Sequence, residues 1–162
     1  MPHTRLQLTE MRYQPASTGP AYTATLAVDG WPLATVTDDG AGAITLDPED
    51  VAVTNDGLRA YLAACRFQDS PIDIPRLLQA LADEHFIGLA VAQAEADGGT
   101  QLRLADDAGH TRALRPITPA PHGLTELLEV GGELAREHAT GEWQIWTGHS
   151  WFPVPGSTRQ PV

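Results

Sequence analysis

Two adjacent carboxylates, Asp38 and Asp39, open the glycine-rich segment 38–42, which reads DDGAG. Carboxylate oxygens in such a turn could hold a hard cation such as Ca²⁺ or Mg²⁺. A calcium loop of the helix-loop-helix type needs ligands at about six positions and a closing Glu near the twelfth, and the acids from Asp47 to Asp50 have a different spacing. The sequence therefore favours aspartates that bond the backbone of their own turn, with a metal site at Asp38 and Asp39 as the alternative.

Three of the four tryptophans lie within nine residues: Trp143, Trp146 and Trp151. Tryptophan is enriched where proteins bind their partners, and it also fills cores, because a buried indole removes a large apolar area from water. On one strand Trp143 and Trp146 would point to opposite faces, so at least one of them is expected to be accessible. Together with His149 in the intervening turn, these residues are the predicted partner-binding set. Packing of the tryptophans against the last helix is the alternative.

The remaining acids, bases and nucleophiles form no catalytic pattern. The six histidines are scattered, and none pairs at the spacing of a zinc site. Glu84 and His85 are neighbours on an expected helix, where adjacent residues point to different faces, so they are expected to form its polar side. Cys65 lies on an apolar stripe, and no glycine loop precedes a lysine that could bind phosphate. We predict no catalytic residue and no cofactor, and a protein that is not an enzyme is favoured.

Composition narrows the choice of partners. The 162 residues include 21 acids and 10 basic residues, all of them arginine, for a net charge of −11. This charge repels nucleic acids and membrane surfaces but complements a basic protein, so we expect a protein partner and no direct nucleic-acid or membrane contact. The single cysteine excludes an internal disulfide, and no apolar leader or membrane-spanning run is visible, which predicts a cytoplasmic protein.

Alternating apolar and polar residues predict several strands. Residues 4–13 form the expected first strand, and residues 22–46 form an expected hairpin or meander that turns at Asp29-Gly30. A second hairpin is predicted over residues 100–117, and a final one is expected around the Thr147-Gly148-His149 turn.

Apolar stripes of helical period predict helices over residues 58–67, 71–95 and 124–138. Asp47 followed by Pro48 matches an N-cap and a first helical residue, so a short turn of helix is also expected there, interrupted at residues 55–57. Residues 86–92 are apolar on most sides and contain Gly88. They could continue the second helix or form a buried strand, and the sequence does not separate these alternatives.

These elements predict a single α+β domain over residues 1–153. Its antiparallel sheet, made from N-terminal hairpins, packs against two or three helices, and a strand or hairpin closes the C-terminal part. The proline-containing segment 154–162 is predicted to be a disordered tail.

The N-terminal pattern resembles a family of small uncharacterised proteins from bacteriophages and mobile elements. The residues that carry this resemblance are Tyr22, Ala24, Leu26, Val28, Asp29, Gly30, Ala34, Val36, Asp38, Asp39, Gly40 and Gly42. Later matches are Leu102-Arg103-Leu104 and the segment Gln144 to Trp151, whereas Ala43 stands where the family usually has a second glycine. The resemblance implies a phage or mobile-element context and no particular reaction.

Three functions fit these observations. The first is a non-enzymatic accessory or inhibitor protein that binds a partner protein through its acidic surface and the tryptophan-bearing hairpin. The second is a small metal- or ligand-binding protein or enzyme that uses Asp38 and Asp39. The third is an acidic mimic of nucleic acid, which requires carboxylates in two rows on one surface. The sequence leaves the partner and the oligomeric state open.

Overall fold

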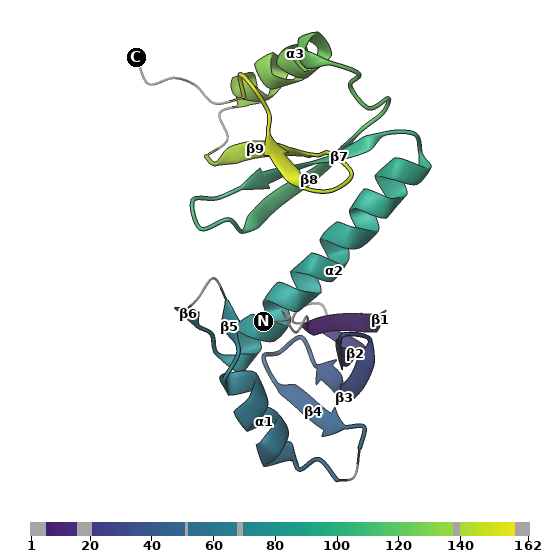
Figure 1. The fold of residues 1–162 in the computed structure, drawn as a ribbon, viewed down its shortest axis with the longest axis vertical. Coiled ribbons are helices and arrows are strands. Elements are labelled where there is room, and N and C mark those ends of the chain that lie inside the picture. Colours follow the sequence, from purple (N-terminus) through teal and green to yellow (C-terminus); the bar gives the residue numbers. More distant parts are fainter. Residues whose placement is uncertain (1–5, 16–20, 51, 68–69, 138–139, 158–162) are drawn as a thin grey trace. The chain divides into compact units, whose positions relative to one another are not determined.

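The computed structural model describes residues 6–15, 21–50, 52–67, 70–137 and 140–157. It is an α+β fold with two four-stranded antiparallel sheets and three α-helices in this part of the chain (Figure 1). The sequence predicts one domain over residues 1–153, and the structure divides the chain into two compact units, each with a core of its own. Unit 1 is Met1–His85 and unit 2 is Phe86–Val162.

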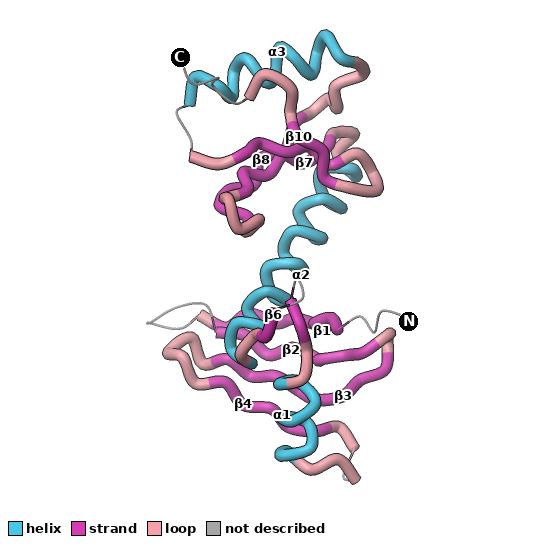
Figure 2. Tube along the Cα trace, turned by 60° about the vertical axis from the view of Figure 1, so that its left-hand side comes forward, coloured by secondary structure: helices cyan, strands magenta, loops and turns pink. Residues whose placement is uncertain are grey.

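Unit 1 contains a four-stranded meander. Its strands are β1 (Leu6–Gln14), β2 (Ala21–Val28), β3 (Trp31–Asp38) and β4 (Ile44–Pro48). Each strand pairs with its sequence neighbour in the order β1-β2-β3-β4. The chain continues through α1 (Asn55–Ala63), the two-residue strands β5 (Arg66–Phe67) and β6 (Ser70–Pro71), and α2 (Ile74–Ala96). Figure 2 separates the strands from these helices by colour.

The predicted turn at Asp29-Gly30 joins β2 to β3. Both residues have positive φ, 49° and 84°, and Val28 pairs with Trp31 across them. Two positive φ angles in a two-residue loop define the turn type whose twist matches the flanking strands, and Asp-Gly is one of its preferred sequences. The hairpin predicted within residues 22–46 is confirmed.

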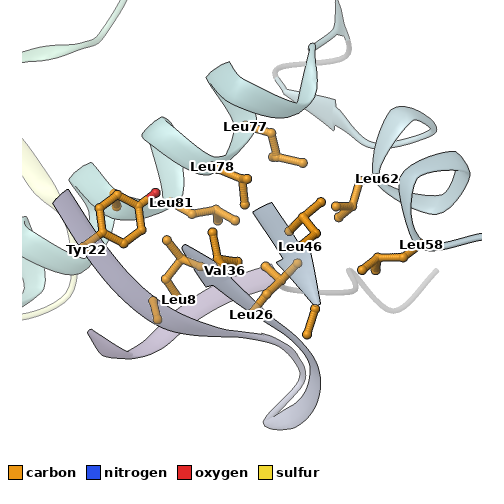
Figure 3. Close-up of a cluster of buried hydrophobic side chains, with 13 residues drawn as sticks. Leu8, Tyr22, Leu26, Val36, Leu46, Leu58, Leu62, Leu77, Leu78 and Leu81 are labelled. Carbon is orange, nitrogen blue, oxygen red and sulfur yellow. The ribbon is translucent and has the colours of Figure 1, made fainter. Parts of the chain in front are cut away.

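One face of the unit 1 sheet carries its core. Leucines of α1 and α2 point at side chains of the four strands in Figure 3. The six largest fully buried side chains of the described chain include Leu26, Val36, Leu46, Leu62 and Leu78, all from this cluster. Burying each such side chain stabilises the fold by roughly 1.5–3 kcal/mol before entropy is counted, so this contact holds the helices on the sheet.

The helix expected to start at Asp47 is a wrong prediction. Asp47 and Pro48 end β4, where they pair with Thr35 and Ala34 of β3. Pro48 is compatible with this place because β4 is an edge strand, which does not need every N–H for pairing. The helix begins at the segment expected to interrupt it: Thr54 is the N-cap of α1, and its Oγ1 accepts a hydrogen bond of 3.1 Å from the Gly57 amide.

The structure decides the alternatives for residues 86–92 in favour of helix. α2 runs without interruption from Ile74 to Ala96, through Gly88. Gly88 is exposed, and a Cβ added there would meet nothing within 4 Å. The position therefore tolerates glycine without requiring it.

Unit 2 contains the second sheet, with the order β10-β9-β7-β8. Its strands are β7 (Thr100–Ala105), β8 (Thr111–Ile117), β9 (Glu142–Trp146) and β10 (Trp151–Pro153). α3 (Leu124–Leu134) continues into a 3₁₀ turn, η1 (Ala135–Glu137). The core is formed by Leu102, Leu104, Leu134, Trp143, Ile145 and Val154. The predicted C-terminal hairpins are therefore present.

The first residues of the predicted tail pack in unit 2. Val154 is buried in the core, and its amide bonds to the Trp143 carbonyl at 2.8 Å. The Ser157 hydroxyl donates to the Val154 carbonyl, also at 2.8 Å. A Cβ added to Gly131 of α3 would lie 1.9 Å from the Pro155 carbonyl oxygen, so the chain passes directly over this glycine. Residues 158–162 lie outside the described part.

Gly88→Ala is expected to stabilise the protein. Alanine loses less conformational entropy than glycine in a helix, and at this site it causes no clash, so the gain should be about 0.5–1 kcal/mol. Thermal unfolding followed by far-ultraviolet circular dichroism would measure it. A loss of stability would contradict a continuous helix at this position.

Gly131→Ala should have the opposite effect, although both glycines are helical. The new methyl group collides with the Pro155 backbone, and overpacking of this kind costs roughly 1–3 kcal/mol. Urea unfolding monitored by tryptophan fluorescence would report it, because three of the four tryptophans belong to unit 2. Unchanged stability would show that residues 154–157 do not pack on α3.

Candidate functional site

The predicted C-terminal hairpin consists of β9 and β10. Trp146 pairs with Trp151 across it. Its turn is closed by the Thr147 amide and hydroxyl, which both donate to the Ser150 carbonyl at 3.0 Å, and Gly148 supplies a φ of 91°. His149 is exposed in this turn, between Gly148 and Ser150.

Strand alternation separates the three predicted tryptophans. Trp143 is 4% exposed and lies opposite Leu104 on the face that packs against α3. Its Nε1 is buried and has no hydrogen-bond partner among the described residues. The Arg115 guanidinium lies 5.2 Å from its ring centroid and pairs bidentately with Glu137 at 2.6 and 2.8 Å. Trp143 is therefore a core residue, as the packing alternative expects.

Trp146 and Trp151 form an aromatic pair on the other face of the sheet. Their ring centroids are 5.4 Å apart at an interplanar angle of 59°. The Arg103 guanidinium lies 4.6 Å from the Trp151 centroid, and its Nε donates to Gln144 Oε1 at 2.8 Å. Burial lowers the pKa of Arg103. Because the arginine guanidinium is always charged in proteins, a cation is held on this stack.

A pocket of about 520 Å³ adjoins this pair, and we call it the Trp146 pocket. Apolar walls come from Pro121, Leu127 and Ile145, and glycines form part of its lining. Among the described residues that line it, only Glu95 of α2 has a charged side chain, and its carboxylate accepts the Trp146 indole N–H at 3.0 Å. This hydrogen bond fixes the ring at the pocket wall. The site can therefore receive an apolar side chain beside a preset aromatic ring and one carboxylate.

Glu95, Arg103 and Leu127 belong to the site but are not among the residues predicted for it from the sequence. Glu95 and Trp146 are 51 positions apart, and their contact depends on how α2 meets β9. Arg103 and Gln144 are 41 positions apart, and their contact depends on strand register. The one usable signal is the alternation of Arg103 between two buried leucines, which places it on the outer face.

Asp38 and Asp39 organise their own turn. Asp38 Oδ1 accepts the Gly40 amide at 2.8 Å, and Asp39 Oδ1 accepts the amides of Ala41 and Ala43 at 2.7 and 3.0 Å. The hydrogen bond from Ala41, followed by that from Ala43, lowers the pKa of Asp39. Asp106 plays the same role at the β7–β8 turn. In the described part of the chain, no group of three or more His, Cys, Asp or Glu could hold a metal ion.

Cys65 is a poor nucleophile. The side chain is half-buried at the end of α1, and burial raises the pKa of its thiol. Because the thiolate is the reactive form, a raised pKa makes it scarce at neutral pH.

No protein-family model, curated protein or solved structure matches this chain. Within the described residues, no helix combines the length and the apolar character needed to cross a bilayer.

Asp39→Ala is expected to lower the melting temperature at pH 7 and to lose this effect in acid. A carboxylate whose pKa is lowered by folding stabilises the folded state above its ordinary pKa, and the contribution disappears as pH falls through the lowered value. Thermal unfolding of wild type and variant from pH 7 to pH 2 would measure the difference.

Asp107→Ala, which removes the same charge from an exposed turn residue, is the matched control. A difference for Asp39→Ala that stays constant with pH would contradict the role of the two amides. Stabilisation by added CaCl₂ that is lost in the Asp38→Ala, Asp39→Ala double variant would establish the metal site instead.

Proposed function

We propose that this protein is a non-enzymatic accessory or inhibitor protein that binds a partner protein through its acidic surface and the β9–β10 hairpin. The observation that carries this proposal is the Trp146 pocket, with an aromatic pair held in place by Glu95 and Arg103. The resemblance to phage and mobile-element proteins supports an accessory role of this kind.

The chemistry of the site supports binding. Tryptophan and arginine are the residues most enriched where a few side chains carry most of the binding energy. An aromatic ring that is already fixed loses little conformational freedom when a partner binds, so more of the contact energy appears as affinity. Here the ring of Trp146 is fixed by a hydrogen bond and that of Trp151 by a stacked cation.

Exposed apolar side chains near the pocket favour a protein over a small molecule. Leu124 and Leu128 of α3 are 65% and 48% exposed, and each is next in sequence to a residue that lines the pocket. Phe152 of β10 is 55% exposed. A small ligand in the pocket would leave these side chains in water, whereas a protein surface can cover them.

The net charge supports a basic partner. A protein with a charge of −11 attracts a basic surface over a distance of about a Debye length, and this raises the rate of encounter. The specific contact is then made by the apolar and aromatic groups, so the association rate should fall with salt while the pocket determines the dissociation rate.

The Trp146→Ala, Trp151→Ala double variant is expected to lose the partner. Tagged wild type would recover a specific protein from host lysate, and affinity for that protein, once purified, should fall at least tenfold in the variant, because a hot-spot residue contributes about 2 kcal/mol or more. Circular dichroism and thermal unfolding would establish that the variant folds.

Leu114→Ala is the matched control, because it removes an exposed apolar side chain from β8, at the opposite edge of the same sheet. Glu95→Gln is a milder second variant that removes the charge next to the Trp146 ring and keeps its aromatic area. Equal affinity of wild type and the folded double variant, or no specific protein in the wild-type sample, would refute the proposal.

A further inference from the structure

The outer side of α3 carries an apolar row that unit 2 leaves exposed. Leu124 and Leu128 are about one turn apart and so lie on the same side of the helix, and they are 65% and 48% exposed. Apart from residues 154–157, no described element of unit 2 lies over α3 on the side away from the sheet (Figure 1). A partner that covers this row would gain the free energy of removing its apolar area from water.

A row of glutamates runs along the same helix. Glu126, Glu129 and Glu133 are all exposed, and their spacing places them on one side of α3, which contains no basic residue. Glu126 accepts the His122 amide at 2.7 Å. Glu129 and Glu133 take part in no hydrogen bond or ion pair within the described part of the chain. The helix therefore presents negative charge close to its apolar row.

Small residues separate the two rows. Thr125 and Gly132 are about two turns apart, and the helical period puts them between the leucines and the glutamates. A Cβ added to Gly132 would meet nothing within 4 Å, so the backbone is open to a close approach there. Gly131 differs, because the Pro155 carbonyl covers it. We call this exposed side the α3 face, and its residues are Leu124, Thr125, Glu126, Leu128, Glu129, Gly132 and Glu133.

We propose that the α3 face binds a basic amphipathic helix of the partner protein. A helix that crosses Gly132 would place apolar side chains on the leucine row and Lys or Arg side chains opposite Glu129 and Glu133. An extended segment would gain less, because a helix surface has no open sheet edge with which its backbone could pair. The net charge of −11 favours the same basic ligand.

This inference deepens the proposed function and rests on it for the existence of a basic protein partner. It identifies the element by which that partner binds. Gly123 and Leu127 line the Trp146 pocket, so the α3 face begins next to that site. None of the residues of the α3 face is among the described residues that line the pocket, so each surface can be altered without the other.

The test uses nuclear magnetic resonance of the full chain labelled with ¹⁵N. The amide of Gly132 is identified as the signal lost in Gly132→Ala, a variant that should fold because the added methyl group meets nothing. The probe is the blocked peptide acetyl-KLAKKLAKLAKKLAKLA-amide, whose leucines follow the helical period. We expect a saturable shift of the Gly132 signal at low salt, where contacts between exposed charges are strongest.

Three comparison peptides separate the features that the proposal requires. The first contains two central residues as D-isomers, which keeps the composition and the charge but breaks the helix. The second has Gln in place of every Leu and so lacks the apolar row. The third has Glu in place of every Lys and so reverses the charge. Isothermal titration calorimetry should show that each binds at least tenfold more weakly than the probe.

The Leu124→Gln, Leu128→Gln double variant is expected to bind the probe at least tenfold more weakly, because two apolar contacts are lost. It should fold, since both side chains are exposed, and circular dichroism would establish this. Leu114→Gln makes the same change at an exposed leucine of β8, outside the α3 face, and should leave the affinity within twofold of wild type.

The Glu129→Gln, Glu133→Gln double variant is expected to weaken binding at least threefold, since two exposed charge contacts are lost. The Asp47→Asn, Asp107→Asn variant changes the net charge equally at exposed residues outside the α3 face. It should leave the affinity within twofold of wild type. A general attraction between an acidic protein and a basic peptide would affect both variants alike.

The peptide also separates this inference from the proposed function. The Trp146→Ala, Trp151→Ala variant should bind the peptide normally, because neither tryptophan belongs to the α3 face. If that variant loses the partner protein but the wild type binds no peptide, this inference is refuted and the proposed function stands. If the peptide binds as expected but the partner protein is recovered equally by wild type and variant, only the proposed function is refuted.

The proposal would be overturned by an unchanged Gly132 signal at millimolar probe or by equal binding of any comparison peptide. Equal effects of the α3 variants and their matched controls would also overturn it. A Gly132 signal that moves with protein concentration alone would identify a second copy of the chain as the occupant and would refute the proposal as well.

Discussion

Both units depend on the alternation of side chains across an antiparallel sheet. Once Leu102 and Leu104 are committed to the core, Arg103 must lie on the opposite face, and cross-strand pairing then brings it to Gln144. The same rule puts Trp143 in the core and Trp146 outside. Hydrophobic burial fixes the register, and the register assembles the outer-face site from residues that are distant in sequence.

The turns that join the strands are stabilised locally. Asp39 and Asp106 each accept two backbone amides from residues that follow within four positions, so these turns need no help from the core. The same acidic residues account for part of the charge of the chain. Turn geometry is therefore sufficient to explain an acidic residue at a hairpin tip. A functional role for such a residue needs an additional structural feature to support it.

The parts of the fold that local physics determines were predictable. Period-two alternation and the Asp-Gly turn identify the N-terminal hairpin, and apolar stripes identify the helices. The helix predicted to start at Asp47-Pro48 is wrong because this pair is compatible both with a helix start and with the end of an edge strand. Only the pairing of β4 with β3 decides between these two structures. Gly88 does not distinguish a helix from a strand over residues 86–92, because glycine weakens both. At the site, the position of Trp146 outside the core follows from strand alternation. Its hydrogen bond to Glu95 could not be predicted, because it depends on how α2 meets β9.

The candidate site of unit 2 orders its aromatic rings with charged groups of its own. The Glu95 carboxylate holds Trp146 and the Arg103 guanidinium lies over Trp151, so both charged groups belong to the chain itself. The pocket beside these rings therefore has mainly apolar area to offer. A partner therefore adds mainly apolar contact at this surface.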